Sequence, residues 1–240
     1  MNNSDVIFEK IVLAGAPCLM AYTQNKEKAA ANGTVLFYHG LFFHKDGHHK
    51  ELSSLAQAGY LAIGVDAIGH GERARSDLKE WLGVKELFEN RFIELVSQTA
   101  HEVPHILDAL LNLSLVDDVR VAMMGVSFGA YITYLTVLEE KRIVAAIPLL
   151  GNPEWPQHPN SPHLRPEEFY PVALLSQTAG LDTSVPPLSA RNLHENLRPH
   201  YSITPERLRY VEYRYSGHFM REEDWNTAWR ISMDWLKKFL

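Results

Sequence analysis

The stretch Ala122–Leu135, AMMGVSFGAYITYL, decides how the rest of the sequence is interpreted. It places Ser127 between Gly125 and Gly129, with an apolar run before the glycines and another after them. Glycine loses more backbone freedom on folding than any other residue, so two glycines around one hydroxyl indicate a sharply bent backbone. The run before the serine predicts a strand, and the run after it predicts a helix. Ser127 is therefore expected at a strand-to-helix turn.

The runs around this turn continue an alternation of strands and helices along the whole chain, which is typical of an α/β fold with parallel strands joined by helices. Strands are expected within residues 6–15, 17–24, 33–40, 60–71, 119–127, 144–151, 170–180 and 207–216, the first two as a hairpin. Helices are expected at residues 50–59, 77–113 with an interruption before Pro104, 128–141, 186–197 and 222–240. The pattern predicts a mostly parallel sheet of about eight strands with helices on both faces.

Length and composition fit a single α/β domain over residues 1–240, because apolar residues make up 46% of the chain and provide a substantial core. The net charge of −6 is spread along the sequence, so no basic surface for a nucleic acid is expected. The N-terminal stretch lacks a basic start followed by an apolar run, so no signal peptide is expected. Cys18 is the single cysteine, which excludes an intramolecular disulfide and fits a cytoplasmic location.

One uncharged window resembles a membrane span in length. Val121–Leu138 contains 18 residues without a charge, which is close to the length that crosses a bilayer. The window also contains Ser127, Thr133 and Thr136. It divides into a strand and a helix with a glycine-flanked break between them, so we expect no membrane span.

The pattern Gly-x-Ser-x-Gly between a strand and a helix is typical of a nucleophile elbow. The hydroxyl of Ser127 would stand at the carboxyl edge of the sheet, above a helix N-terminus whose N–H groups favour an oxyanion. A serine nucleophile needs a base, and the base needs an acid that orients it. Asp182 follows a later strand and His218 lies between the last strand and the last helix, which matches the chain order of such sites. Glu154, which follows the preceding strand, stays open as the alternative acid.

Five motifs resemble those of the α/β-hydrolase superfamily, in particular its small dienelactone-hydrolase-like and prolyl-oligopeptidase-like carboxylesterases. They are YHGLF (38–42), DAIGHGE (66–72), GVSFG (125–129), GLDTSVPP (180–187) and SGHF (216–219), in the family's order and spread over about residues 30–240. The resemblance implies an α/β-hydrolase fold. It also implies Ser127 as the nucleophile, His218 as the general base and then acid, and Asp182 as the orienting carboxylate.

An oxyanion hole made of two backbone N–H groups is expected beside the nucleophile. One donor is expected at Phe128, the residue after the nucleophile. The family pattern after His-Gly implies Leu41 as the second donor, with Phe42 as the neighbouring alternative. His39 is expected to support this loop rather than to catalyse.

The substrate pocket is expected to contain Phe42 and Phe43 on one side and Trp155 on the other. Trp155 belongs to a segment, residues 152–171, that holds six prolines. Proline is excluded from helix interiors and central strands, so this segment is expected to be an ordered loop or a minimal cap.

Other polar residues near these motifs carry weaker signals. Glu72 and Arg73 follow a Gly-His-Gly sequence, and they either contact a polar substrate or form a surface salt bridge. His44, His48 and His49 lie close together, but no carboxylate or cysteine pattern completes a metal site. We therefore expect neither a metal nor a cofactor.

The sequence predicts a serine esterase that acts on short-chain or small esters through an acyl-enzyme, with a small-molecule ester as its partner. A peptidase, an amidase or an acyltransferase would use the same three residues, so these alternatives stay open. A non-catalytic binding protein of this fold would often lack one of the three. A dehalogenase would need an aspartate in place of Ser127.

Overall fold

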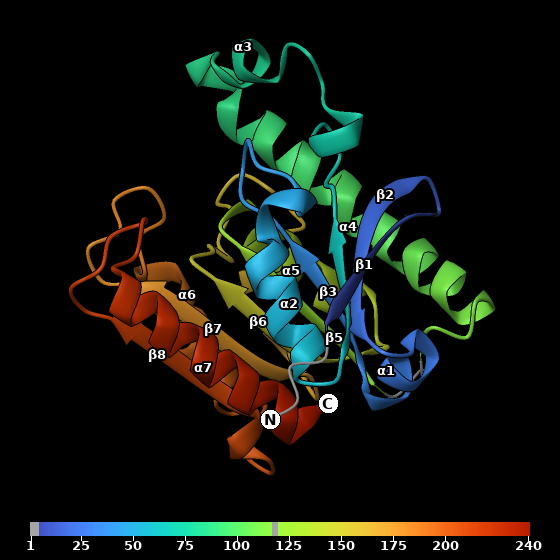
Figure 1. The fold of residues 1–240 in the computed structure, drawn as a ribbon. Coiled ribbons are helices and arrows are strands. Elements are labelled where there is room, and N and C mark those ends of the chain that lie inside the picture. Colours follow the sequence, from blue (N-terminus) through green and yellow to red (C-terminus); the bar gives the residue numbers. More distant parts are fainter. Residues whose placement is uncertain (1–4, 117–119) are drawn as a thin grey trace.

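The structure is a computed structural model that describes residues 5–116 and 120–240 (Figure 1). Within these residues the chain forms an eight-stranded sheet with the strand order β1-β2-β4-β3-β5-β6-β7-β8. The strands are β1 (Val6–Leu13), β2 (Ala16–Thr23), β3 (Thr34–Tyr38), β4 (Leu61–Val65), β5 (Val121–Val126), β6 (Ile143–Leu149), β7 (Ala173–Ala179) and β8 (Leu208–Tyr213). β2 pairs antiparallel with β1 and with β4, and all the other pairs are parallel. The expected α/β-hydrolase fold is confirmed. Val119, the first residue of one expected strand, and the first four residues lie outside the described ranges.

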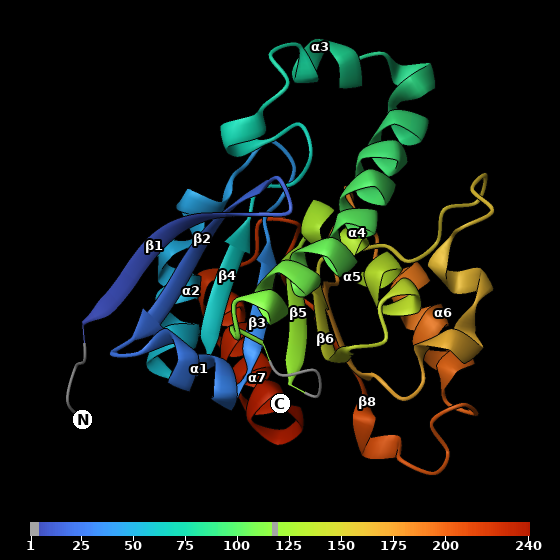
Figure 2. The same cartoon turned by 90° about the vertical axis from the view of Figure 1, so that its right-hand side faces the viewer.

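Helices cover both faces of the sheet (Figures 1 and 2). They are α1 (Lys26–Asn32), α2 (His49–Gln57), α3 (Leu78–Leu82), α4 (Phe88–Asn112), α5 (Phe128–Glu139), α6 (Leu188–Leu197) and α7 (Glu222–Phe239). α2 and α7 pack on one face through residues such as Leu52, Leu55 and Trp235, while α4 and α5 pack on the other. Strands β3, β4 and β7 are buried along their whole length. The sequences of β3 and β4 are accordingly nearly continuous apolar runs.

The single cysteine lies inside this core. Cys18 of β2 is 1% exposed, and its thiol donates to the carbonyl oxygen of Ala16. Burial raises the pKa of the thiol to about 12, because a thiolate would lose its hydration in apolar surroundings. Cys18 therefore acts as a small core residue.

The helical region expected at residues 77–113 is divided differently from the prediction. α3 ends at Gly83, and α4 runs without interruption through Pro104. Proline removes one N–H from a helix interior and crowds the preceding turn, so an interruption was expected there. Packing against α5 and the sheet offsets that loss, through the buried residues Ile93, Val96, Ala100, Val103, Leu107 and Leu110. The expected break at Pro104 is wrong because this apolar stripe continues on both sides of the proline.

The uncharged window Val121–Leu138 divides at Ser127 into β5 and α5, as expected. Within residues 5–116 and 120–240, no helix combines the length and the apolar character that crossing a membrane requires.

The carboxyl ends of the parallel strands meet at one edge of the sheet, and two segments extend beyond it. One contains α3 and the first turns of α4, which project past the strand ends (Figure 2). The other is the proline-rich segment 152–171 between β6 and β7, which contains two 3-10 turns, Pro162–Leu164 and Pro166–Phe169. The backbone N–H of Trp155 donates to the hydroxyl of Ser161 at 2.6 Å, which closes this segment into an ordered loop.

Candidate active site

Ser127 occupies the corner between β5 and α5 with a strained backbone. Its φ of +53° and ψ of −113° lie outside the regions that residues with a Cβ usually adopt. The Ser127 N–H donates to the carbonyl oxygen of Leu149 on β6 at 2.8 Å, which holds the corner against the sheet. Such strain persists only where the surrounding structure enforces it.

Close backbone approaches explain both neighbouring glycines. A Cβ on Gly125 would lie 2.1 Å from the carbonyl oxygen of Gly129, and a Cβ on Gly129 would lie 2.2 Å from the carbonyl oxygen of Tyr38. The atoms met are backbone atoms, which cannot move aside on their own. The two glycines thus let β3, β5 and the start of α5 come together, and this brings Ser127 next to the loop that follows β3.

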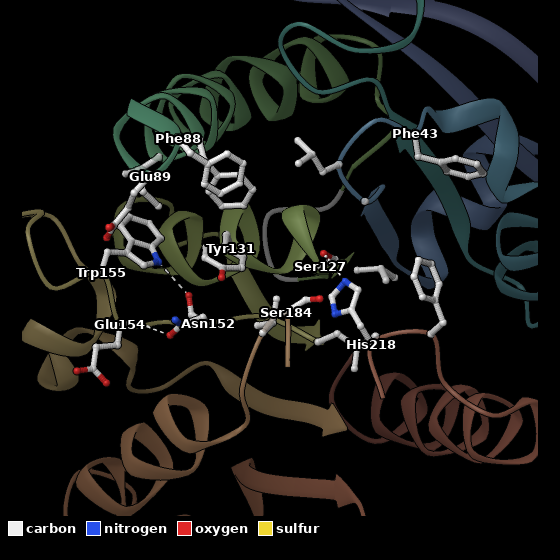
Figure 3. Close-up of a pocket in the computed structure, with 18 of the residues that line it drawn as sticks. Phe43, Phe88, Glu89, Ser127, Tyr131, Asn152, Glu154, Trp155, Ser184 and His218 are labelled. Carbon is white, nitrogen blue, oxygen red and sulfur yellow. Dashed lines mark hydrogen bonds between the residues drawn. The ribbon is translucent and has the colours of Figure 1, made fainter. Parts of the chain in front are cut away.

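Ser127, His218 and Asp182 form one hydrogen-bonded chain across three loops. The Ser127 hydroxyl lies 3.0 Å from Nε2 of His218 (Figure 3), and Nδ1 of His218 lies 2.7 Å from Oδ2 of Asp182. Because a carboxylate only accepts hydrogen bonds, Nδ1 carries the proton and Nε2 is left to accept from the hydroxyl. The three residues follow β5, β8 and β7, so the parallel sheet delivers them to the same edge.

Asp182 is held firmly toward His218. Its side chain is buried, and its second oxygen, Oδ1, accepts the backbone N–H groups of Ser184 at 2.9 Å and Val185 at 2.8 Å. Glu154, the alternative acid, lines the outer end of the cavity, away from His218 (Figure 3). The structure therefore pairs His218 with Asp182 and not with Glu154.

The backbone N–H groups of Leu41 and Phe128 lie beside Ser127. Neither has a protein acceptor among the residues that the structure describes. Phe128 is the first residue of α5, so its N–H belongs to the electropositive end of that helix. Leu41 lies in a turn in which the Phe43 N–H donates to the carbonyl oxygen of Gly40 at 3.2 Å. Phe42 takes the left-handed position of this turn, with φ of +60°.

His39 supports this turn and is not part of the hydrogen-bonded chain at Ser127. Its Nδ1–H donates to the carbonyl oxygen of Gly40 at 2.8 Å, and its Nε2 accepts the N–H of Ala67 at 3.1 Å. Burial lowers the pKa of the ring to about 3, so His39 is neutral at physiological pH. The residue ties the loop after β3 to the loop after β4.

An ion cluster around the buried Lys45 joins the same two loops. The Lys45 side chain is fully buried, with Nζ 2.8 Å from Oδ2 of Asp66 and 2.7 Å from Oε1 of Glu72. Burial alone would lower the pKa of Lys45, but the hydrogen-bonded carboxylates raise it above its usual value. Arg73 donates to the carbonyl oxygen of Asp66 and pairs with Glu102 at 2.7 Å. Glu72 and Arg73 thus hold loops together and do not line the cavity.

A cavity of about 880 Å³ opens beside Ser127 and His218 (Figure 3). Of the residues expected around the substrate, Phe43 and Trp155 line this cavity. Phe42 does not line it and is 48% exposed, because it occupies the outer corner of the turn and its side chain projects into solvent.

Four further residues form a wall of the cavity that the sequence did not indicate: Phe88, Glu89, Phe92 and Tyr131. Three of them belong to the first turns of α4, which are distant in sequence from every recognised motif. Of the four, only Tyr131 could have been found from the sequence, because it lies four residues after Ser127 and therefore on the same face of α5.

His44, His48 and His49 do not come together as metal ligands. Within the described part of the chain, no three histidine, cysteine, aspartate or glutamate side chains are placed to hold a metal ion. His48 instead places its Nδ1 3.3 Å from Glu51 and packs edge-on against the ring of Phe43.

Comparisons with known proteins agree with this architecture. The curated Bacillus subtilis (strain 168) protein named "Putative esterase YitV" is 24% identical over 234 residues, which cover 85% of this chain and 89% of that protein. The structure of TT1662 from Thermus thermophilus has a TM-score of 0.79 at 22% identity, with 98% of both chains covered. A structure described as a "Putative Dienelactone Hydrolase" from Klebsiella pneumoniae subsp. pneumoniae MGH 78578 has a TM-score of 0.74 at 20% identity, covering 98% of this chain and 100% of that one.

At these identities the solved structures show a shared fold. The family model described as "Alpha/beta hydrolase family" matches residues 35–239, from β3 to the end of α7. Because the match spans most of the chain, the protein belongs to the alpha/beta hydrolase family.

Proposed function

We propose that the protein is a serine carboxylester hydrolase in which Ser127 is the nucleophile. The hydrogen-bonded chain from Ser127 through His218 to Asp182 carries this proposal. It combines a hydroxyl, a base with a free nitrogen and a buried orienting carboxylate at the mouth of a cavity. The resemblance to a Bacillus subtilis protein named as an esterase supports the choice of ester bonds.

The first half of the reaction acylates the serine. The Ser127 oxygen attacks the ester carbonyl carbon while Nε2 of His218 takes the hydroxyl proton. The carbonyl oxygen becomes an oxyanion, and the N–H groups of Leu41 and Phe128 donate to it. When the carbon–oxygen bond to the alcohol breaks, the protonated His218 returns that proton to the leaving alcohol. Asp182 stays ionised throughout and stabilises the imidazolium.

The second half repeats these steps with water. His218 takes a proton from water, the resulting hydroxide attacks the acyl carbon, and a second oxyanion forms against the same N–H groups. The acyl–oxygen bond to Ser127 then breaks, and His218 returns the proton to the serine. Each fixed oxyanion donor is worth about 10²–10³ in rate, because it is already oriented before charge develops.

Short-chain or small esters are the expected substrates. The cavity of about 880 Å³ has the volume of a site for a small molecule. On one side it is closed by the parallel rings of Tyr131 and Trp155, whose centroids lie 6.2 Å apart (Figure 3). We expect this closed side to favour short acyl chains over chains of about ten or more carbons.

The test is hydrolysis of a p-nitrophenyl ester series from acetate to laurate by the wild type and by Ser127→Ala. We expect turnover of the short esters by the wild type and a fall in kcat of about four to six orders of magnitude in the variant. Asp182→Asn should lose about three to four orders, because the imidazole would then be held in the wrong tautomer.

Ser97→Ala is the matched control, since Ser97 lies on α4 outside the cavity. It should retain the activity of the wild type. Undiminished hydrolysis by Ser127→Ala, or a clear preference for laurate, would contradict the proposed nucleophile or the proposed substrate size, respectively.

A further inference from the structure

The charges that face the cavity are of one sign. Glu89 and Glu154 line it, and no lysine or arginine does so within the described part of the chain. Neither carboxylate takes part in an ion pair among those residues, unlike Asp66 and Glu72 in the ion cluster. An anionic substrate would therefore meet two uncompensated carboxylates, whereas a cation would meet two unpaired partners.

Aromatic rings surround the same end of the cavity. The rings of Phe88 and Phe92 are stacked with centroids 5.7 Å apart, and Phe92 meets Tyr131 edge-on at 4.9 Å. Tyr131 in turn lies parallel to Trp155, with 12° between their planes. In Figure 3, Glu89, Trp155 and Glu154 all lie on the side of the cavity away from Ser127. We call Glu89, Glu154, Tyr131 and Trp155 the acidic end.

Polar groups of the loop at the acidic end already form hydrogen bonds within the protein. Aromatic rings and carboxylates are therefore the groups that remain to contact a ligand. The indole N–H of Trp155 donates to the carbonyl oxygen of Asn152 at 2.9 Å, and the backbone N–H of Glu154 donates to the Asn152 side chain at 2.8 Å. Trp155 is 2% exposed and lies parallel to Tyr131, so it supports the half-buried Tyr131 ring, which is the ring that a ligand would meet. Burial raises the pKa of Tyr131, and the negative charges of Asp182 and Glu89 add to this rise.

These features together describe a site for an organic cation. An ammonium group is attracted to the faces of Trp and Tyr rings by their quadrupoles, and a nearby carboxylate adds Coulomb attraction. Phe43 lines the opposite end of the cavity (Figure 3), which suits an uncharged part of a substrate. The reacting ester bond would lie between the two ends, at Ser127.

We propose that the substrates of this hydrolase carry a cationic amine or quaternary ammonium group, bound at the acidic end while the ester bond lies at Ser127. This inference rests on the proposed esterase function for the reaction itself. The cation belongs either to the acyl part or to the alcohol part of the ester, and the two positions are separated by the choice of substrates below.

Two isosteric pairs test the proposal. Methyl 6-(trimethylammonio)hexanoate and methyl 7,7-dimethyloctanoate differ only in the charge of the acyl part. Acetylcholine and 3,3-dimethylbutyl acetate differ only in the charge of the alcohol part. We expect kcat/KM to favour the charged member of at least one pair by about tenfold. The preference should appear mainly in KM, because the acidic end does not touch the reacting atoms.

Variants then assign the preference to residues. Glu89→Gln and Glu154→Gln should each reduce the charged-to-neutral ratio of kcat/KM by about three- to fivefold. Glu94→Gln is the matched control, because Glu94 is exposed on the same helix as Glu89 but does not line the cavity. An equal effect of Glu94→Gln would mean that overall net charge, and not the acidic end, sets the ratio, which would overturn the proposal.

Binding separates this inference from the proposed function. The intact esters are titrated calorimetrically into Ser127→Ala, which cannot form the acyl-enzyme. Tighter binding of the charged esters supports the acidic end even if the wild type hydrolyses neither these esters nor the p-nitrophenyl series, an outcome that would reject only the esterase proposal. Equal binding of both members of both pairs overturns the inference, even if the wild type hydrolyses every ester.

Discussion

At the scale of the residue, Lys45 shows how carboxylates stabilise a buried charge. Its ammonium group is fully buried and lies within hydrogen-bond distance of Asp46, Asp66 and Glu72. Its backbone N–H also donates to the second oxygen of Asp66 at 2.9 Å. Burial would raise the pKa of Asp66, but the hydrogen bonds from Lys45 hold it below its usual value. Lys45 and Asp66 therefore both stay ionised, and each depends on the other to compensate its buried charge.

Lys45→Met should lower the free energy of unfolding by about 3–5 kcal/mol, because Asp66 would remain buried without its counter-charge. Urea titration followed by circular dichroism measures the change. The double variant Lys45→Met/Asp66→Leu should recover part of the loss. Lys10→Met is the control: Lys10 also pairs with Glu72, but its side chain is 65% exposed, so its loss should lower the free energy of unfolding far less. Equal losses in both lysine variants would contradict the argument.

At the scale of the element, α4 carries a proline in its interior and continues as a helix past it. The backbone carbonyl oxygen of Pro104 accepts a hydrogen bond from the Arg142 guanidinium at 3.1 Å, which ties α4 to the residue before β6. The missing N–H at this position still leaves one carbonyl of the preceding turn without its helical donor. Packing of the buried stripe holds α4 together in spite of this local cost.

Pro104→Ala should therefore stabilise the protein, by about 1–3 kcal/mol, because it restores the helical N–H and removes the ring from the preceding turn. Thermal and urea unfolding at neutral pH would measure the gain, and esterase activity should not change. His105→Ala, a change at the adjacent exposed position, should shift stability by no more than about 0.5 kcal/mol. A loss of stability in Pro104→Ala would mean that the surroundings of α4 require the proline ring.

The strands and the strand-to-helix turn were predictable because their signals are local. Each buried strand is a short apolar run that ends in glycine or a polar loop, and Gly125 and Gly129 are required by contacts at Ser127 itself. The adjacency of Asp182 and His218 followed from topology, since parallel strands deliver their following loops to one edge. α1 was not predicted, because it is a seven-residue helix with two buried alanines and no apolar stripe.

The walls of the cavity were not predictable in the same way. Phe88 and Glu89 reach it only because α4 projects past the strand ends, and nothing in their local sequence encodes that position. Phe42 and Phe43 are neighbours with the same side chain, and only the left-handed backbone at Phe42 decides which one faces the cavity. Side chains that meet through tertiary packing leave no periodic trace in the sequence.

At the scale of the whole molecule, buried neutral histidines make stability depend on pH. Burial lowers the pKa of both His39 and His194 from 6.5 to about 3. The ring of His39 faces His70 and bridges two loops, while Nε2 of His194 lies 2.7 Å from the hydroxyl of Ser176. Below pH 6.5 the unfolded chain binds protons at these positions and the folded protein does not. Stability is therefore fully present above that pH and falls as the pH decreases toward 3.

Between pH 7 and pH 5, each of these histidines should remove about 2 kcal/mol from the free energy of unfolding. Urea titrations at intervals of half a pH unit would give the slope. In His194→Asn the slope should correspond to about one proton fewer. An unaltered slope in His194→Asn would show that this residue is protonated in the folded state.

The burial of Cys18 has a consequence for chemical labelling. With a thiol pKa of about 12, only about one molecule in a hundred thousand carries a thiolate at pH 7. Iodoacetamide and maleimides act on thiolates, so the native protein offers them no reactive sulfur. A fluorophosphonate or another serine-directed reagent can therefore be applied to this protein without blocking cysteine first, and a single covalent adduct in its mass spectrum would count nucleophilic serines alone.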